Sequence, residues 1–285
     1  MHNENAVSFP PAEPETGERE YVLGTNDAEL TRLGFQHQVW AAQTAAAWER
    51  AGFRPGSRLL DVGCGPGYGT FALAQLVGPT GSVLGVDVSE RFVRYLDAER
   101  ARRDVRQVET RVGDLASVEL PDGDLDGVFA RWVLCFVNDP AAVVRRVAQS
   151  LRPGGTFVVL DYVRYEALTV APHSDVIQRV IQAVCRSFRD AGGDPDIGQM
   201  LPSYMHDAGM EVTSVRPILR VARPGTALWE WPATFFANFL PSLVASGGIT
   251  EEDRLAFAGE WDARSKSRDA FLLTPPLVEV IAVRR

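Results

Sequence analysis

Several common sequence signatures are missing from this chain. It has three cysteines, Cys64, Cys135 and Cys185, an odd number at wide spacings. Such usage is typical of a reducing cytoplasm, and the spacings match no metal-ligand pattern. No apolar run reaches the ~18 residues that a membrane span needs. The N-terminus lacks the basic region and the apolar core of a secretory signal. We therefore expect a cytoplasmic protein with no membrane association and no metal site.

A surplus of positive charge is missing too. The formal net charge is −8, from 29 Lys and Arg against 37 Asp and Glu. Nucleic-acid binders usually carry a basic face, so this balance argues against a nucleic-acid partner. Local basic runs at 100–106 and 145–152 fall on predicted helices. We interpret them as solvated helix faces.

Short β-rich runs alternate with helical ones from residue 57 onward, which predicts an α/β fold with a parallel sheet covered on both faces. The expected strands are 57–63, 82–88, 107–113, 125–134, 156–163, 211–219 and 277–284. The expected helices are 66–77, 89–103, 139–151, 174–193 and 201–210, and the sequence RPGG predicts a turn before the fifth strand.

The chain is predicted to hold one main domain with added pieces. Residues 1–20 are rich in Pro, Glu and Asn, which predicts a disordered arm. Residues 21–50 are expected to form a helical cap, and residues 51–285 the main domain. Helical lid insertions are expected within that domain at 164–200 and at 225–274, the second of them dense in aromatic residues.

The sequence LLDVGCGPGYG ends a predicted strand in alternate glycines. Ligands of open α/β sheets bind beyond the carboxyl ends of the strands, so this turn is the default site. A dinucleotide fingerprint needs G-x-G-x-x-G, but Tyr68 or Thr70 stands where the third glycine would fall. No lysine follows, which excludes a phosphate-binding loop. We expect Gly63, Gly65 and Gly67 to let a ligand without phosphates lie against bare backbone.

The stretch DVGCGPG closely resembles the first motif of class I S-adenosylmethionine-dependent methyltransferases, and further matches follow in order. VLGVDVSE ends the second strand in an acid, VGDL follows the third strand, and LRPGG precedes the fifth. The resemblance implies a Rossmann-like, mostly parallel seven-stranded sheet with S-adenosylmethionine as cofactor. Residues 21–40 and the C-terminal part are similar to small-molecule enzymes akin to the ubiquinone and menaquinone methyltransferases.

The resemblance also implies roles for single residues. Asp61 would order the turn and help to hold the cofactor's ammonium group, Asp87 would accept from both ribose hydroxyls, and Asp114 would accept from the adenine amino group. Gln36 and Tyr21 are candidate contacts to the cofactor's carboxylate or methyl region, with simple helix packing as the alternative. The complete cofactor set is Asp61, Gly63, Gly65, Gly67, Asp87, Val88, Gly113, Asp114, Leu115, Arg131, Trp132, Gln36 and Tyr21.

Methyl transfer from a sulfonium is an in-line displacement that a dry, aromatic-lined cavity favours. The candidate pocket residues are Tyr162, Tyr165, Trp229, Phe235 and Phe236. Core packing is the alternative for the aromatic residues that follow one another at helical spacing. A general base, where the accepting atom needs one, would be a histidine, and the candidates are His37, His173 and His206.

These features predict an enzyme that methylates a small, largely apolar metabolite, for instance in secondary metabolism. Two alternatives stay open. One is a protein or RNA methyltransferase, although ARWV stands where many amine-methylating enzymes of that class carry an N-P-P-Y-type tetrapeptide. The other is a fold that binds the cofactor and catalyses a reaction other than methylation. The sequence defines neither the accepting atom nor the oligomeric state.

Overall fold

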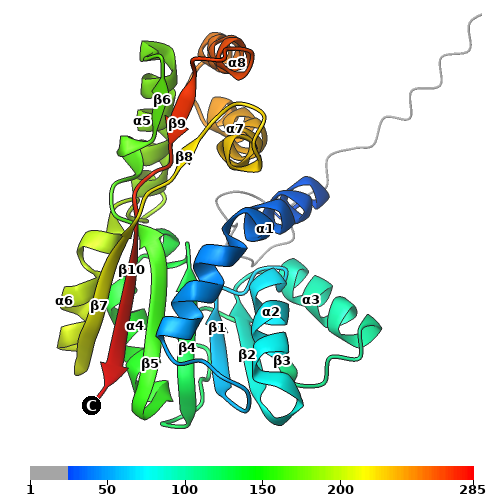
Figure 1. Ribbon diagram of the computed structural model, residues 1–285, viewed down its shortest axis with the longest axis vertical. Helices are drawn as coiled ribbons and strands as arrows, with labels where there is room; N and C mark the ends of the chain where they lie inside the picture. The colour runs from blue at the N-terminus through cyan, green and yellow to red at the C-terminus, as the bar shows by residue number, and fades with distance from the viewer. Residues whose placement is uncertain (1–24) are drawn as a thin grey trace, which may run out of the picture.

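The computed structural model describes residues 25–285, so the predicted arm at 1–20 and Tyr21 lie outside the described residues. A sheet with helices on both faces forms the lower body in Figure 1. A second group of helices and short strands, residues 165–190 and 221–273, stands above one end of the sheet and is called the upper lobe below. Within the described chain, no helix combines the length and the apolar character needed to cross a membrane.

Seven strands form the central sheet in the order β3-β2-β1-β4-β5-β10-β7. They are β1 (Arg58–Val62), β2 (Ser82–Asp87), β3 (Val108–Val112), β4 (Leu125–Arg131), β5 (Leu151–Tyr162), β7 (Met210–Ile218) and β10 (Leu277–Arg284). The first five run parallel, and β10 lies antiparallel between β5 and β7. The predicted Rossmann-like, mostly parallel seven-stranded sheet is confirmed.

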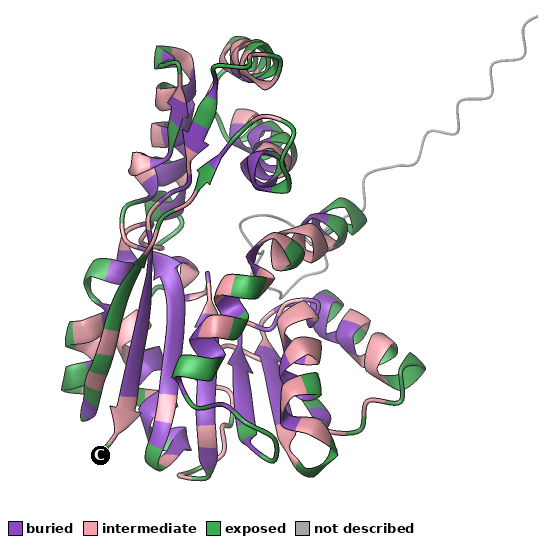
Figure 2. Cartoon of the chain, viewed as in Figure 1, coloured by how far each residue is buried: buried purple, intermediate pink, exposed green. Residues whose placement is uncertain are grey.

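Helices cover the two faces of this sheet. On one side lie α1 (Asp27–Arg50), α2 (Tyr68–Val77) and α3 (Glu90–Arg102), and on the other α4 (Pro140–Ser150) and α6 (Leu201–Asp207). Successive strand residues point to opposite faces, so Leu59 packs in the core beneath α1 and α2, whereas Leu60 packs in the core beneath α4. Purple therefore dominates the central strands in Figure 2.

The upper lobe contains a small sheet as well as helices. Its helices are α5 (Asp175–Asp190), α7 (Ala227–Ala245) and α8 (Glu251–Ser265), preceded by the 3-10 turn η3 (Tyr165–Ala167). Its strands β6 (Thr169–Ala171), β8 (Val221–Ala222) and β9 (Phe271–Leu273) pair antiparallel in the order β6-β9-β8. The expected helical insertions are present, and the structure adds these three strands to them. Strands of two or three residues are too short to show an alternating pattern in the sequence.

Four chain segments connect the upper lobe to the body, and together they form a neck (residues 163–164, 191–200, 219–220 and 274–276). Backbone hydrogen bonds join three of these segments to one another, and the Gln199 side chain joins the fourth to Val163. The Val163 N–H donates to the Pro276 carbonyl over 3.0 Å, and the Thr274 N–H donates to the Arg220 carbonyl over 2.9 Å. The Arg220 N–H in turn donates to the Thr274 hydroxyl over 3.1 Å.

Two strand boundaries differ from those expected by more than one residue. β5 begins at Leu151, so the predicted RPGG turn lies inside the strand, where the pairing with β4 shifts register. Pro153 has no N–H to donate and Gly154 has a φ of +77°, which explains the irregular pairing. β4 ends at Arg131 rather than at residue 134. Trp132 ends it, because its φ of +53° is incompatible with an extended strand.

Candidate active site

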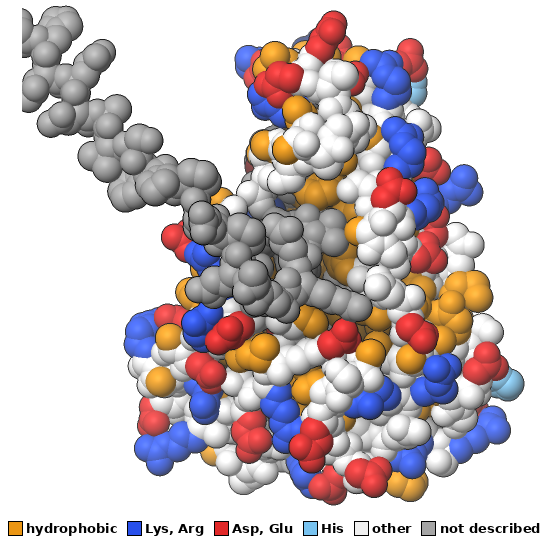
Figure 3. All heavy atoms as spheres, turned by 180° about the vertical axis from the view of Figure 1, so that it is seen from behind, with side chains coloured by type: hydrophobic (Ala, Val, Ile, Leu, Met, Phe, Trp, Pro, Cys, Tyr) orange, Lys and Arg blue, Asp and Glu red, His pale blue; other side chains and the backbone are white. Residues whose placement is uncertain are grey.

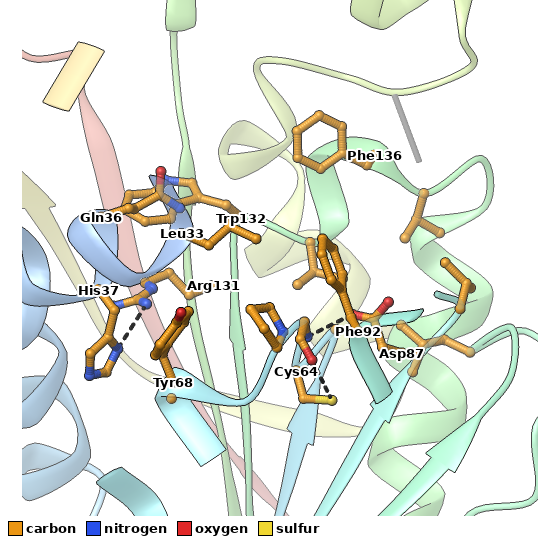
Figure 4. Close-up of a pocket in the computed structure, with 18 of the residues that line it drawn as sticks. Leu33, Gln36, His37, Cys64, Tyr68, Asp87, Phe92, Arg131, Trp132 and Phe136 are labelled. Atoms are coloured by element: carbon orange, nitrogen blue, oxygen red, sulfur yellow. Dashed lines mark hydrogen bonds between the residues drawn. The ribbon is translucent and has the colours of Figure 1, made fainter. Parts of the chain in front are cut away.

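A cavity of about 420 Å³ lies where the carboxyl ends of β1, β2, β4 and β5 face α1 and the upper lobe. This is the position at which open α/β sheets bind their ligands. Its volume falls in the range of roughly 300–1,000 Å³ that is usual for small-molecule sites. Figure 4 shows side chains converging on the cavity from α1, from the turn after β1 and from the segment after β4.

The glycine turn after β1 forms the floor of the cavity. Gly63, Gly65 and Gly67 all have a positive φ, of +62°, +53° and +87°. A Cβ atom added at Gly65 would meet nothing within 4 Å, so this glycine opens directly onto the cavity. A Cβ atom at Gly63 would come within 2.5 Å of Val133, and one at Gly67 within 2.3 Å of Leu96. Gly67 does not line the cavity, and the lack of a side chain there is explained by packing against Leu96. The expectation that all three glycines make room for a ligand was therefore wrong for Gly67.

Carboxylates lie at the end of the cavity formed by β2 and β3. Asp87 ends β2, and its side chain accepts from the Gly65 N–H over 2.8 Å and from the Ser89 N–H over 2.9 Å. Burial raises the pKa of Asp87, against the backbone hydrogen bonds, which lower it. Asp114 lines the same end. The residues predicted to hold ribose and adenine are thus brought together.

Their neighbours divide into lining and supporting residues. Val88 and Leu115 line the cavity beside these carboxylates. Gly113 lies behind them, because a Cβ atom there would come within 2.8 Å of Val118. Its N–H donates to the Asp87 carbonyl over 2.9 Å. The role of Gly113 in the structure is therefore to position β3 against β2.

A buried guanidinium group lies in the wall of the cavity. Arg131 ends β4 and donates from Nη1 to the Thr44 hydroxyl over 2.6 Å. Among the described residues, no carboxylate lies within the 4.0 Å that would make an ion pair with it. Burial lowers the pKa of Arg131 to about 10, with Asp61 acting in the opposite direction. A buried cation without an ion-pair partner is costly, so this group is suited to an anionic ligand.

Asp61 and His37 both interact with this guanidinium, the first electrostatically and the second through its ring. Asp61 does not line the cavity; it accepts from the Thr70 hydroxyl over 2.7 Å, and burial raises its pKa to about 6. His37 lines the cavity and lies with Nδ1 3.4 Å from Nη2 of Arg131. Burial and the neighbouring Arg131 lower the pKa of His37 to about 4. The imidazole is therefore neutral at pH 7, and its Nδ1 accepts from the guanidinium.

Aromatic rings line the half of the cavity nearest the upper lobe. Of the predicted pocket residues, Tyr162, Tyr165 and Phe235 line it. Trp132 lines it as well, stacked between the rings of Tyr162 and Trp231 at centroid distances of 6.1 Å and 5.7 Å. These rings form a continuous wall from β4 to α7.

Two predicted pocket aromatics and two predicted bases lie elsewhere. Trp229 and Phe236 pack against Trp261 inside the upper lobe, because α8 covers that side of α7. His173 and His206 are exposed on the surface, and neither lines the cavity. The structure therefore corrects all four of these assignments.

The structure adds lining residues that the sequence analysis missed. They are Arg32, Leu33, Tyr68, Phe136 and Phe188, among others. Arg32 precedes Gln36 by one helical turn, so the placement of Gln36 at the site could have indicated it. The contribution of Phe188 from α5 depends on how the upper lobe sits over the sheet, which local sequence does not encode. In residues 25–285, no group of three or more His, Cys, Asp or Glu is placed to hold a metal ion.

Comparison with known proteins bears on the chemistry of this site. Residues 60–159 match a family model described as a methyltransferase domain. The chain is 45% identical over 102 residues, 36% of each chain, to the nocamycin O-methyltransferase of Saccharothrix syringae. It is 31% identical over 162 residues to the demethylmenaquinone methyltransferase of Symbiobacterium thermophilum, covering 55% of this chain and 64% of the relative. The predicted resemblance to the class I S-adenosylmethionine-dependent methyltransferases is thus confirmed over the methyltransferase domain at residues 60–159.

The fold agrees with this family. Geranyl diphosphate C-methyltransferase from Streptomyces coelicolor superposes with a TM-score of 0.58 at 17% identity, covering 87% of this chain and 77% of that one. The sequence-based assignment of the family and of S-adenosylmethionine as its cofactor is confirmed. The matches cover less than two thirds of the length of the curated relatives named here.

Proposed function

We propose that this chain transfers the methyl group of S-adenosylmethionine to a small molecule with a largely apolar body. One observation carries the proposal. A single cavity has carboxylates at one end, a buried guanidinium in its wall and aromatic rings at the end beneath the upper lobe. The first two features suit a nucleoside joined to an amino acid, and the third suits an apolar acceptor.

The residues of the cavity fit the cofactor. Asp87 would accept from the ribose hydroxyls, and Asp114 with Leu115 would lie at the adenine. Gly65 leaves its backbone open to the ligand. Arg131 would bind the carboxylate of the amino-acid tail, since it is buried and has no ion-pair partner within the described chain. When bound, the cofactor supplies an electrophilic methyl group on a sulfonium.

The protein's own contribution is to position the acceptor and to exclude water. Trp132, Tyr162 and Phe235 present ring faces and edges that tolerate a sulfonium charge and replace water around the acceptor. Holding the nucleophile and the methyl carbon within about 3–3.5 Å and in line is the larger effect. His37 is held neutral next to Arg131, where it would orient the guanidinium rather than take up a proton at pH 7.

A small-molecule acceptor also fits the surface charge. The net charge is −8, and on the face seen in Figure 3 the basic side chains are interspersed with acidic ones. Polyanion-binding proteins gather basic residues on one face instead. This supports a small molecule over RNA as the substrate.

Cofactor labelled in its methyl group, incubated with the protein and fractionated cell extract, tests the proposal. We expect label in small, organic-soluble compounds. Label that appears only in protein or RNA would replace this proposal with the macromolecular alternative. Cofactor binding without label transfer to any fraction would favour a reaction other than methylation.

A further inference from the structure

The wall that α1, the end of β5 and η3 contribute to the cavity presents hydrogen-bond donors. Its polar side chains are Arg32, Gln36, His37, Tyr162 and Tyr165, and Nδ1 of His37 already accepts from Arg131. The acidic residues that line the cavity within the described chain, Asp87 and Asp114, lie at the opposite end, after β2 and β3. An acceptor molecule above the cofactor therefore meets a wall of donors. The orientation of each donor follows from its neighbours.

Two donors fix the side-chain amide of Gln36. The Trp231 indole N–H donates to Oε1 of Gln36 over 2.9 Å, and Nη1 of Arg32 donates to the same oxygen over 3.0 Å. Indole and guanidinium groups have no acceptor, so both must face the amide oxygen. The NH₂ group of Gln36 is thereby left as the part of the amide that can donate to a ligand. Figure 4 shows Gln36 above Leu33, next to the ring of Trp132.

A buried carboxylate holds the Arg32 guanidinium in place. Nε and Nη2 of Arg32 each donate to Glu29 over 2.7 Å. Glu29 is fully buried and also accepts from the amide of Asn238 on α7 over 2.7 Å. This two-pronged geometry orders a side chain that would otherwise be mobile. The hydrogen-bond donors of a charge-paired guanidinium are therefore held in fixed positions at the edge of the cavity.

The two tyrosines add neutral hydroxyl groups next to this charge. Neither the Tyr162 nor the Tyr165 hydroxyl makes a hydrogen bond within residues 25–285, and both residues line the cavity. Burial raises the pKa of both phenols, so both remain protonated at neutral pH. The Arg32 guanidinium lowers the pKa of both phenols, against the effect of burial. It therefore lies close enough to interact electrostatically with the two hydroxyls.

We propose that this donor wall binds a hydrogen-bond-accepting oxygen of the substrate, a carbonyl or carboxylate group carried on an apolar body, and selects against a protonated amine. The inference rests on the proposed function and narrows its substrate class. An accepting oxygen completes the hydrogen bonds of Gln36, Tyr162 and Tyr165. A protonated amine offers no acceptor to these groups and leaves their hydrogen bonds unmade. Phe136, Phe188 and Phe235 provide the surface for the apolar body.

Binding of three probes of matched shape tests the inference. The protein is first titrated with S-adenosylhomocysteine, and the loaded protein is then titrated by calorimetry with 2-naphthoate, 2-acetylnaphthalene and 2-naphthylmethylammonium. We expect both oxygen-bearing probes to bind at least about tenfold more tightly than the ammonium probe, because buried polar groups left unpaired penalise it. The double variant Tyr162→Phe/Tyr165→Phe should weaken the oxygen-bearing probes by roughly tenfold or more and leave S-adenosylhomocysteine binding unchanged.

Tyr204→Phe on α6 is the matched control, since Tyr204 lies outside the cavity lining, and it should change neither titration. Failure to bind S-adenosylhomocysteine would count against the proposed function itself. Normal S-adenosylhomocysteine binding with equal or tighter binding of the ammonium probe would overturn the donor-wall inference alone. The same holds if neither oxygen-bearing probe binds, or if the double variant binds them as well as the unchanged protein does.

Discussion

Arg131 and Thr44 join the end of β4 to α1 through a hydrogen bond of 2.6 Å between Nη1 and the hydroxyl. The helix that covers the cavity therefore fixes the guanidinium that ends a central strand. Thr44 itself is anchored, because its hydroxyl donates to the Trp40 carbonyl over 2.9 Å. The position of the buried charge thus depends on residues 87 positions apart in the chain.

Replacing Arg131 by Met should weaken S-adenosylhomocysteine binding by about 10- to 100-fold, the loss expected for a hydrogen bond to a charged group. Adenosine lacks the amino-acid tail, so its affinity should stay the same. Calorimetric titration of both ligands measures the difference. Equal losses for adenosine and S-adenosylhomocysteine would show that Arg131 does not bind the tail.

Asp87→Asn should weaken both ligands, because both contain the ribose that Asp87 would bind. We expect a loss of at least about tenfold for each, since a neutral amide replaces a charged acceptor. Asp104→Asn is the matched control, as Asp104 is exposed and away from the cavity. Unchanged affinities in Asp87→Asn would remove this residue from the proposed cofactor site.

His37 should make the protein less stable in mild acid. Its pKa is lowered from 6.5 to about 4, so the unfolded chain takes up a proton that the folded protein does not. This contribution to stability is present above pH 6.5 and is lost as the pH falls toward 4. Between pH 7 and pH 5, the free energy of unfolding of His37→Gln should therefore fall by about 1–2 kcal/mol less than that of the unchanged protein.

Urea denaturation at the two pH values measures this difference. Asp61 and Asp161, whose pKa values are both raised to about 6, contribute stability that is lost as the pH rises toward 6. Their effect has the opposite sign, but it is common to both proteins and cancels in the comparison. An identical pH dependence in His37→Gln would show that the imidazole titrates normally in the folded protein.

Arg50 and Glu279 tie the end of α1 to β10. Nε and Nη2 of Arg50 donate to the two carboxylate oxygens, the first over 2.8 Å, and Glu279 is fully buried. Arg50→Met would leave a buried carboxylate without its partner, at a cost of about 1–3 kcal/mol, reduced because Arg50 itself is partly exposed. Arg50→Met/Glu279→Leu should recover most of this loss in urea denaturation. A double variant less stable than Arg50→Met would contradict the explanation.

The sequence predicts the sheet and the cofactor half of the site better than the acceptor half. The strands alternate with helices at regular lengths, and Gly65, Asp87 and Asp114 lie at strand ends, where the position in the chain determines the position in space. Phe235 and Phe236 show the limit of this reasoning. They are neighbours on one helix, yet one lines the cavity and the other faces α8. Which of them does so depends on the packing of the upper lobe, which helical spacing alone does not encode.

The upper lobe is attached to the body of the protein in different ways on its two sides. On one side the neck segments exchange backbone hydrogen bonds, such as that from Thr274 to Arg220. On the other side α7 meets α1 through side chains, with Asn238 donating to Glu29 and Trp231 to Gln36. We therefore expect the lobe to move as a flap hinged at the neck, with a substrate entering where α7 parts from α1. Hydrogen exchange that is faster at the neck than along the facing turns of α7 would refute this.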